Sequence, residues 1–128
     1  MHLPVDLLYT KEHEWIRIDE SGNTATVGIT DFAQGELGDI VYVEIETLSQ
    51  NLERNDIFGT VEAVKTVSDL FLPVAGRVIE INTKLEEKPE VVNEDPYGQG
   101  WMIKLEITGS TTDADLMNSE EYGKMIGV

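Results

Sequence analysis

The hydrophobic positions of the chain fall into short runs with strand-like spacing, separated by turns. Residues 14–19 are β-rich and end in a Glu-Ser-Gly-Asn turn at 20–23, and residues 24–30 supply the return strand of a hairpin. Further strands are predicted over residues 40–45, 76–81 and 101–107, the last because apolar and polar residues alternate there. The pattern therefore predicts a mainly β protein.

Helical features are confined to a few short segments. Residues 31–37 predict one short helix, with Thr30 or Asp31 as its N-cap and Gly38 as its stop. Residues 83–100, which hold two prolines and many acids, predict a loop with one helical turn. From residue 111 onward the apolar residues have helical spacing, and Thr112 or Asp113 would cap a C-terminal helix.

The length of the chain fits one domain with a core of its own. We expect a single domain over residues 1–128, with a β core over about 8–108 and a C-terminal helical segment over 111–126. Residues 38–43 and 76–81 repeat one pattern, a glycine followed by three aliphatic residues at matching positions. A glycine before a strand indicates a turn with unusual backbone torsions, and the repeat predicts two similar half-sheets.

Lys65 stands alone inside an apolar run. The run covers residues 57–72, and no other basic residue lies between Arg54 and Arg77. The β-branched neighbours of Lys65 favour extended backbone, so the run predicts two strands joined by a tight turn with the amine at its tip. Such an amine is either an idle surface charge or a site of covalent modification. A turn made of β-branched residues is a costly place for a lysine, which favours modification, and acylation would remove the charge.

Composition excludes several classes of function. The chain has 25 acidic and 9 basic residues, for a net charge of −16, which argues against nucleic acid as a partner. This charge is typical of a self-repelling monomer, and it would also steer the protein toward partners with basic surfaces. The absence of cysteine rules out disulfides, thiolate metal sites and cysteine nucleophiles.

Targeting signals and independent catalytic motifs are not apparent in the sequence. No apolar run has the roughly twenty residues of a membrane helix, and the N-terminus does not resemble a secretory signal. The cytoplasm is the simplest location, although a processed mitochondrial protein would have the same composition. His13 lies between two glutamates, but the spacing matches no metal motif, and we expect no metal site. An enzyme with its own active site is the weakest interpretation.

Several motifs together resemble those of the glycine cleavage system H protein. They occupy residues 9–15, 25–31, 37–41, 61–69, 92–98 and 100–104, in the order of that family, and the similarity runs from about Leu8 to Tyr122. The family attaches lipoic acid in amide linkage to the lysine of a Glu-x-Val-Lys motif. The resemblance therefore implies N6-lipoyllysine at Lys65, flanked by Glu62, Val64, Thr66 and Asp69.

The resemblance also implies a fold and a function. The fold would be a barrel-sandwich hybrid of two antiparallel sheets, related by a pseudo-twofold axis, with short helices and a C-terminal helix. The protein would be a carrier without a complete active site. It would take an aminomethyl group from a pyridoxal-phosphate glycine decarboxylase to a tetrahydrofolate-dependent aminomethyltransferase, and electrons to dihydrolipoyl dehydrogenase. A lipoate ligase or lipoyltransferase would load it.

In that family the loaded arm can fold back into a surface cleft. Glu12 and Asp69 are our candidates for contacts to the aminomethyl cation, and Phe32 for packing against the apolar arm. Phe32 stands where a histidine can occur in the family, so we expect no imidazole chemistry at that position.

Two related carriers are disfavoured by the sequence, and one further interpretation stays open. A biotin carrier would place methionines beside the lysine, where this chain has Val64 and Thr66. The lipoyl domain of a 2-oxoacid dehydrogenase would have an aspartate before the lysine and a linker to a catalytic domain. A relay that donates lipoate to other proteins has no distinguishing residue in the sequence.

Overall fold

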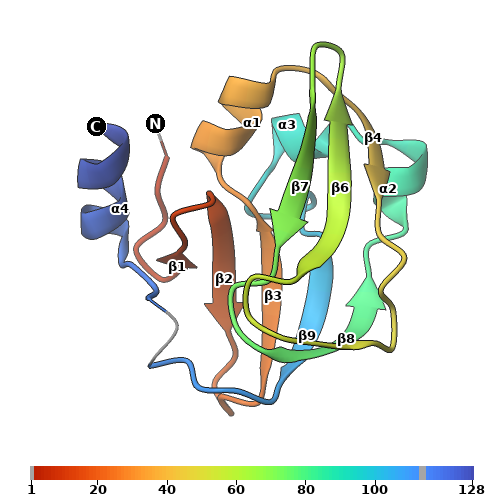
Figure 1. Cartoon of the computed structure of the whole chain (residues 1–128). Coiled ribbons are helices and arrows are strands. Elements are labelled where there is room, and N and C mark those ends of the chain that lie inside the picture. The colour runs from red at the N-terminus through yellow and green to blue at the C-terminus, as the bar shows by residue number, and fades with distance from the viewer. Residues whose placement is uncertain (1, 113–114) are drawn as a thin grey trace.

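Two antiparallel β-sheets form the body of the molecule (Figure 1). The computed structural model describes residues 2–112 and 115–128, and within these the larger sheet has the order β1-β2-β3-β9-β8-β5 and the smaller β4-β6-β7. The strands are β1 (Leu8–Tyr9), β2 (Glu14–Ile18), β3 (Thr24–Ile29), β4 (Ile40–Glu44), β5 (Asn51–Leu52), β6 (Ile57–Ala63), β7 (Val67–Phe71), β8 (Gly76–Ile81) and β9 (Ile103–Ile107). The helices are α1 (Asp31–Leu37), α2 (Lys84–Glu87), α3 (Val91–Glu94) and α4 (Ser119–Ile126). The predicted mainly β class, with two antiparallel sheets and a C-terminal helix, is confirmed.

The main core lies between the two sheets. Val27, Val78 and Leu105 of the larger sheet belong to the same fully buried cluster as Phe58 and Val61 of the smaller one. Each such side chain contributes about 1.5–3 kcal/mol when it is taken out of water. This burial fixes the register of both sheets, because a slip by one residue would turn the apolar face toward solvent.

Helix α1 begins and ends where the sequence predicts. The Thr30 hydroxyl accepts a hydrogen bond from the amide of Ala33 at 3.1 Å, which identifies Thr30 as the N-cap. Gly38 ends the helix with a φ of 80°, a conformation that a side chain would strain. Local capping therefore sets both ends of the helix.

The two glycines of the repeat have different structural roles. Gly38 precedes β4 in the three-stranded sheet, and Gly76 opens β8 in the six-stranded sheet, so the expectation of two similar half-sheets does not describe these sheets of unequal size. Unusual torsions are confirmed at Gly38 alone. Gly76 is required instead for close packing, since a Cβ there would lie 2.6 Å from the carbonyl oxygen of Glu106 on β9.

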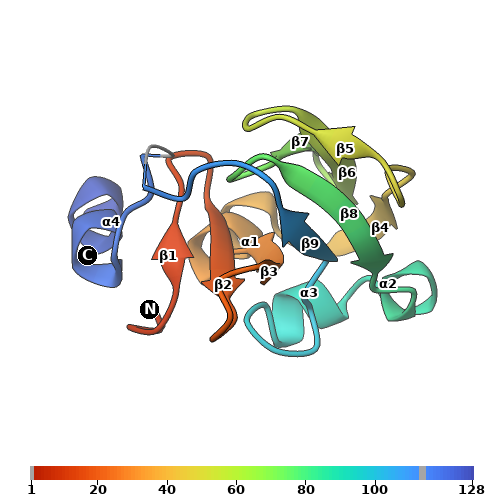
Figure 2. The same ribbon diagram turned by 90° about the horizontal axis from the view of Figure 1, so that it is seen from below.

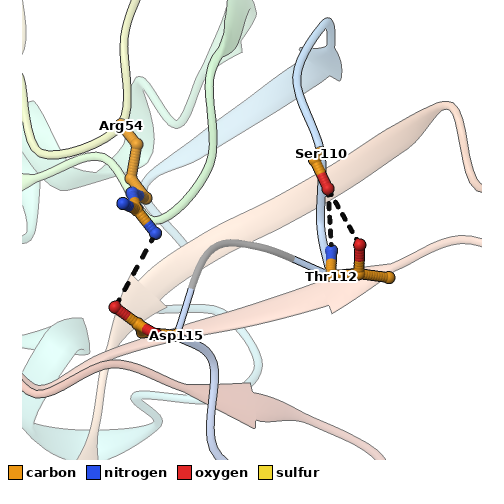
Figure 3. A network of polar contacts seen from close by, with 4 residues as sticks. All are labelled: Arg54, Ser110, Thr112 and Asp115. Atoms are coloured by element: carbon orange, nitrogen blue, oxygen red, sulfur yellow. Dashed lines mark hydrogen bonds and ion pairs between the residues drawn. The ribbon is translucent and has the colours of Figure 1, made fainter.

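Two helical expectations need correction. The segment 83–100 contains two short helices, α2 and α3, where one turn was expected. The C-terminal helix begins at Ser119 and not near residue 111, because Asn118 provides a capping box with Glu121. Thr112 is not a cap: its amide donates to the Ser110 hydroxyl, and the two hydroxyls are also hydrogen-bonded (Figure 3). The alternative cap, Asp113, lies outside the described residues.

A second hydrophobic cluster joins α4 to the larger sheet. Its buried members are Leu7, Tyr9, Trp15, Tyr97 and Tyr122. Tyr9 and Met117 form a β-bridge with two backbone hydrogen bonds of 2.8 Å, and Arg54 pairs with Asp115 at 4.0 Å in the segment that leads to α4 (Figure 3). The view from below shows α4 beside β1 at one edge of the molecule (Figure 2). None of the helices in the described part of the chain is long and apolar enough to cross a membrane.

Candidate functional site

Lys65 lies in the turn of the β6–β7 hairpin, which projects beside α1 (Figure 1). The ladder runs through the pair Glu62–Val67, and the amide of Ala63 donates to the carbonyl of Thr66 at 2.8 Å, so Val64 and Lys65 form the tip. Neither tip residue has a positive φ, which explains how the turn forms without glycine or asparagine. The predicted hairpin with an exposed amine at its tip is confirmed.

The tip is supported from below by the turn between α1 and β4. The amide of Val64 donates to the carbonyl of Asp39 at 3.2 Å. Asn93 of α3 holds this turn in place: its side-chain amide donates to the Gly38 carbonyl, and its Oδ1 accepts from the Ile40 amide, both at 2.9 Å. Because a residue distant in sequence fixes the support, the hairpin tip has a defined position relative to α1.

The surroundings of Lys65 leave its amine accessible. The Lys65 side chain is exposed, Val64 is 77 % exposed, and no ion pair within 4.0 Å involves Lys65 among the residues that the structure describes. Its Cε lies 3.4 Å from the position that a Cβ on Gly38 would take, so the absence of a side chain at Gly38 gives the lysine room. A modifying enzyme would therefore meet a single amine on a well-supported turn.

A pocket of about 350 Å³ opens beside this hairpin, between the edge strand β7, helix α1 and the turn before β2. Strand β7 advances about 3.3 Å per residue, which places Asp69 roughly 7 Å along the strand from Val67, where β7 begins two residues after Lys65. The pocket is lined by Glu12, His13, Ile29, Phe32, Ala33, Glu36, Leu37, Val61, Ser68, Asp69 and Leu70. An arm attached at the tip would lie alongside the strand that leads to this pocket.

The chemistry of the lining is divided between apolar and acidic groups. Ile29, Val61 and Leu70 are buried apolar residues, whereas Glu12, Glu36 and Asp69 supply carboxylates and no lysine or arginine lines the pocket. The apolar walls have a low dielectric constant, and they strengthen the negative electrostatic field of the neighbouring carboxylates. The pocket is therefore suited to an apolar chain that ends in a cation.

One wall depends on a strained turn. His13 has a φ of 70°, and the turn is closed by hydrogen bonds from the His13 amide to the Thr10 carbonyl at 3.1 Å and from the Thr30 amide to the His13 carbonyl at 3.0 Å. The His13 ring packs against Phe32 with 4.9 Å between ring centroids. Burial lowers the pKa of His13, although Glu12 and Glu36 oppose this effect, so the ring is neutral at neutral pH.

Glu14, next to this turn, is a carboxyl group buried in the protein. It is 2 % exposed, and its two oxygens are bonded to the Thr10 hydroxyl at 2.7 Å and the amide of Phe71 at 3.3 Å. Burial raises the pKa of Glu14 to about 8, while its hydrogen bonds to Thr10 and Phe71 act in the opposite direction. Glu14 thus links β2 to β7 behind the pocket, mostly as the neutral acid at pH 7.

Residues singled out from the sequence fall into two groups in space. Glu12, Phe32 and Asp69 line one pocket, as a shared cleft requires. Glu62, Val64 and Thr66 stay at the hairpin tip and do not line it.

Sequence reasoning missed four groups that shape the site, namely His13, Glu36, Asn93 and the buried carboxyl of Glu14. Only the glutamate-rich motif around His13 gave a local signal, and it was interpreted as an unsupported metal site. The contacts of the other residues are made across the fold.

The fold and the site together define a class. A small β-sandwich that presents an accessible lysine on a hairpin, beside a pocket with apolar and acidic walls, has the arrangement of a swinging-arm carrier of the lipoyl and biotinyl type.

Comparison with known proteins identifies the family. Residues 7–127 match the family model described as glycine cleavage H-protein. The glycine cleavage system H protein of Salinibacter ruber is 57 % identical over 125 residues, covering 98 % of this chain and 99 % of its own, and that of Chlorobium limicola is 54 % identical over 127 residues, covering 99 % of each. The crystal structure of a glycine cleavage system H protein from Mycobacterium marinum matches with a TM-score of 0.90 at 35 % identity, covering 98 % of this chain and all of that one.

The chain belongs to the glycine cleavage H-protein family, the lipoyl carrier of the glycine cleavage system. It is a carrier component of a multienzyme system and not an enzyme, as the sequence predicted.

Proposed function

We propose that Lys65 carries lipoic acid in amide linkage and that the pocket lined by Glu12, Phe32 and Asp69 receives the loaded arm. The observation that carries the proposal is the position of the amine: exposed at a supported tip, in the turn that leads into the strand bordering the pocket. The bound group supplies a disulfide that accepts an aminomethyl group and electrons, chemistry for which this cysteine-free chain has no group of its own.

The residues of the chain provide placement and protection. Ile29, Val61 and Leu70 give the arm an apolar surface, and Phe32 adds the face of a ring. Glu12, Glu36 and Asp69 favour the protonated form of an amine at the end of the arm. Protonation matters because loss of the cargo begins when the nitrogen lone pair of the neutral amine expels the thiolate.

We expect removal of the pocket carboxylates to shorten the life of the aminomethyl cargo. In the combined variant Glu12→Gln and Asp69→Asn, release of formaldehyde from the loaded protein should be about fivefold faster, since each exposed carboxylate supplies a modest attraction to the cation. The rate is measured by trapping formaldehyde from loaded protein in the absence of the partner enzymes.

Glu62→Gln is the matched control. It removes a carboxylate at the same hairpin that does not line the pocket, and its release rate should equal that of the parent protein. Equal rates in the double variant and the control would remove Glu12 and Asp69 from the proposal.

The partners follow from the role of a carrier. We propose docking to the pyridoxal-phosphate glycine decarboxylase, the aminomethyltransferase and dihydrolipoyl dehydrogenase, and to the lipoate ligase or lipoyltransferase that modifies Lys65. The net charge of −16 supports a carrier that is monomeric and approaches basic surfaces on these enzymes. Its setting would be the cytoplasm.

Salt should weaken these encounters. Raising ionic strength from about 0.05 M to about 0.5 M shortens the Debye length to a few ångströms, so the apparent KM of the decarboxylase for this carrier should rise severalfold while kcat changes little. Steady-state exchange of labelled bicarbonate into glycine measures both constants. A KM that is independent of salt would exclude electrostatic docking.

A further inference from the structure

Tyr122 joins the C-terminal helix to the wall of the pocket. It lies on α4, is completely buried, and its hydroxyl is hydrogen-bonded both to His13 Nδ1 and to Thr30 Oγ1, each at 2.8 Å. The two partners belong to different elements, the turn before β2 and the cap of α1. A single hydroxyl group therefore ties together the two elements that meet at this side of the pocket.

Both partners have a direct effect on the lining. His13 itself lines the pocket and packs on Phe32, at 4.9 Å between ring centroids. Thr30 accepts a hydrogen bond from the amide of Ala33, another lining residue, and so sets the first turn of α1 that carries Phe32. The φ of 70° at His13 is uncommon for a residue with a side chain, and such a conformation persists only where the surrounding contacts hold it.

The rest of α4 is attached firmly enough to serve as a fixed support. The capping box of Asn118 and Glu121 sets the start of the helix, and the Tyr9–Met117 bridge fastens the preceding residues to β1. The Tyr122 ring is stacked on Tyr9, with centroids 4.8 Å apart and planes inclined by 9°. The hydroxyl is thus held by a rigid, buried aromatic pair.

We propose that Tyr122 is a positioning residue for the arm pocket: through His13 and Thr30, it holds the Phe32 wall in the orientation that receives the arm. Tyr122 does not line the pocket, so it acts on the arm through these partners. The effect on the arm rests on the proposed function of the pocket, whereas the effect on the His13–Phe32 contact does not.

Tyr122→Phe tests this inference because it removes the hydroxyl and keeps the ring stacked on Tyr9. Tyr9→Phe is the matched control: it also deletes a buried tyrosine hydroxyl of the same pair, but that hydroxyl donates to the Pro4 carbonyl at 2.6 Å, away from the pocket. Any general effect of losing a buried hydrogen bond should appear in both variants.

Two measurements separate the inference from the proposed function. In the unmodified protein, NMR should show the nuclear Overhauser contact between the His13 and Phe32 rings in the parent and in Tyr9→Phe, and a loss of most of it in Tyr122→Phe. In the lipoylated, aminomethyl-loaded protein, release of formaldehyde should be roughly fivefold faster in Tyr122→Phe alone, because this variant loses the hydrogen bonds to both His13 and Thr30.

An unchanged ring contact or release rate in Tyr122→Phe, or an equal change in Tyr9→Phe, would overturn the inference. If the folded parent released its cargo as fast as urea-unfolded parent, the protecting role of the pocket would fail instead. The NMR comparison would then still decide whether Tyr122 positions the wall.

Discussion

Replacement of Lys65 by arginine is expected to abolish turnover of the reconstituted glycine cleavage system. Arginine keeps the positive charge and the length of the side chain, but its guanidinium group is not acylated by a ligase that forms a lysine amide. Because the side chain is exposed at the hairpin tip, the fold should be unaffected, with a change in unfolding free energy within about 0.5 kcal/mol. Labelled carbon dioxide released from glycine measures turnover.

The control for this prediction is Lys88→Arg, at another exposed lysine that lies after α2. It should be lipoylated and active like the parent protein. Retention of turnover in Lys65→Arg would mean that the arm is attached elsewhere, and a collapse of thermal melting would mean that Lys65 has a structural role.

The second large effect concerns Glu14 and pH. Burial raises the pKa of this carboxyl from its ordinary value of 4.5 to about 8, so between these values the folded state binds a proton that the unfolded state has released. The free energy of unfolding must therefore fall as pH rises through this range, and it levels off above the folded-state pKa. Above about pH 8, the free energy of unfolding is therefore lower than its value below pH 4.5 by an amount on the order of 5 kcal/mol.

Glu14→Gln should remove this dependence. A glutamine amide is neutral at every pH and retains both contacts, since its oxygen accepts from the Phe71 amide and its nitrogen donates to the Thr10 hydroxyl. The variant should be more stable than the parent at about pH 9, by an amount on the order of 4 kcal/mol. Urea unfolding at about pH 9 measures this difference, and between about pH 7 and about pH 9 the parent should lose on the order of 1 kcal/mol that the variant keeps.

Between about pH 7 and about pH 9, the titration of Glu14 is separated from that of His13 and Tyr122, whose pKa values are also shifted. The lowered pKa of His13 acts below its ordinary value of 6.5, and burial raises the pKa of Tyr122 to about 12. Glu20→Gln, in the exposed turn between β2 and β3, should keep the pH dependence of the parent. A Glu14→Gln variant that is less stable than the parent at about pH 9 would show that the fold favours the ionised carboxylate and that burial does not raise the pKa of Glu14.

Local sequence patterns predicted the hairpin and the helix ends that depend mainly on neighbouring residues. The β-branched run around Lys65 predicts its hairpin, and Thr30 and Gly38 predict the ends of α1, because strand preference and capping depend on neighbouring residues. The start of α4 was misplaced because helical spacing continues through residues that are not helical. The capping box of Asn118 and Glu121 was the signal that would have located it.

Part of the candidate site was also predicted, but from the family resemblance and not from local sequence patterns. The family resemblance pointed to Glu12, Phe32 and Asp69, which the structure brings into one pocket. The contacts that shape this pocket join residues far apart in the chain, such as His13 and Tyr122, which are 109 positions apart. No spacing rule reports such a contact, since it depends on how the finished sheets pack.

The identity of the modified amine tests the account most directly. Trypsin would cut unmodified protein after Arg54, Lys65 and Arg77, and an acylated Lys65 would block the middle cut. Protein purified from its native host grown with lipoate should therefore yield one peptide spanning residues 55–77 that carries the mass of a lipoyl group. Two unmodified peptides divided at Lys65, or a lipoyl group on any other lysine, would contradict the account.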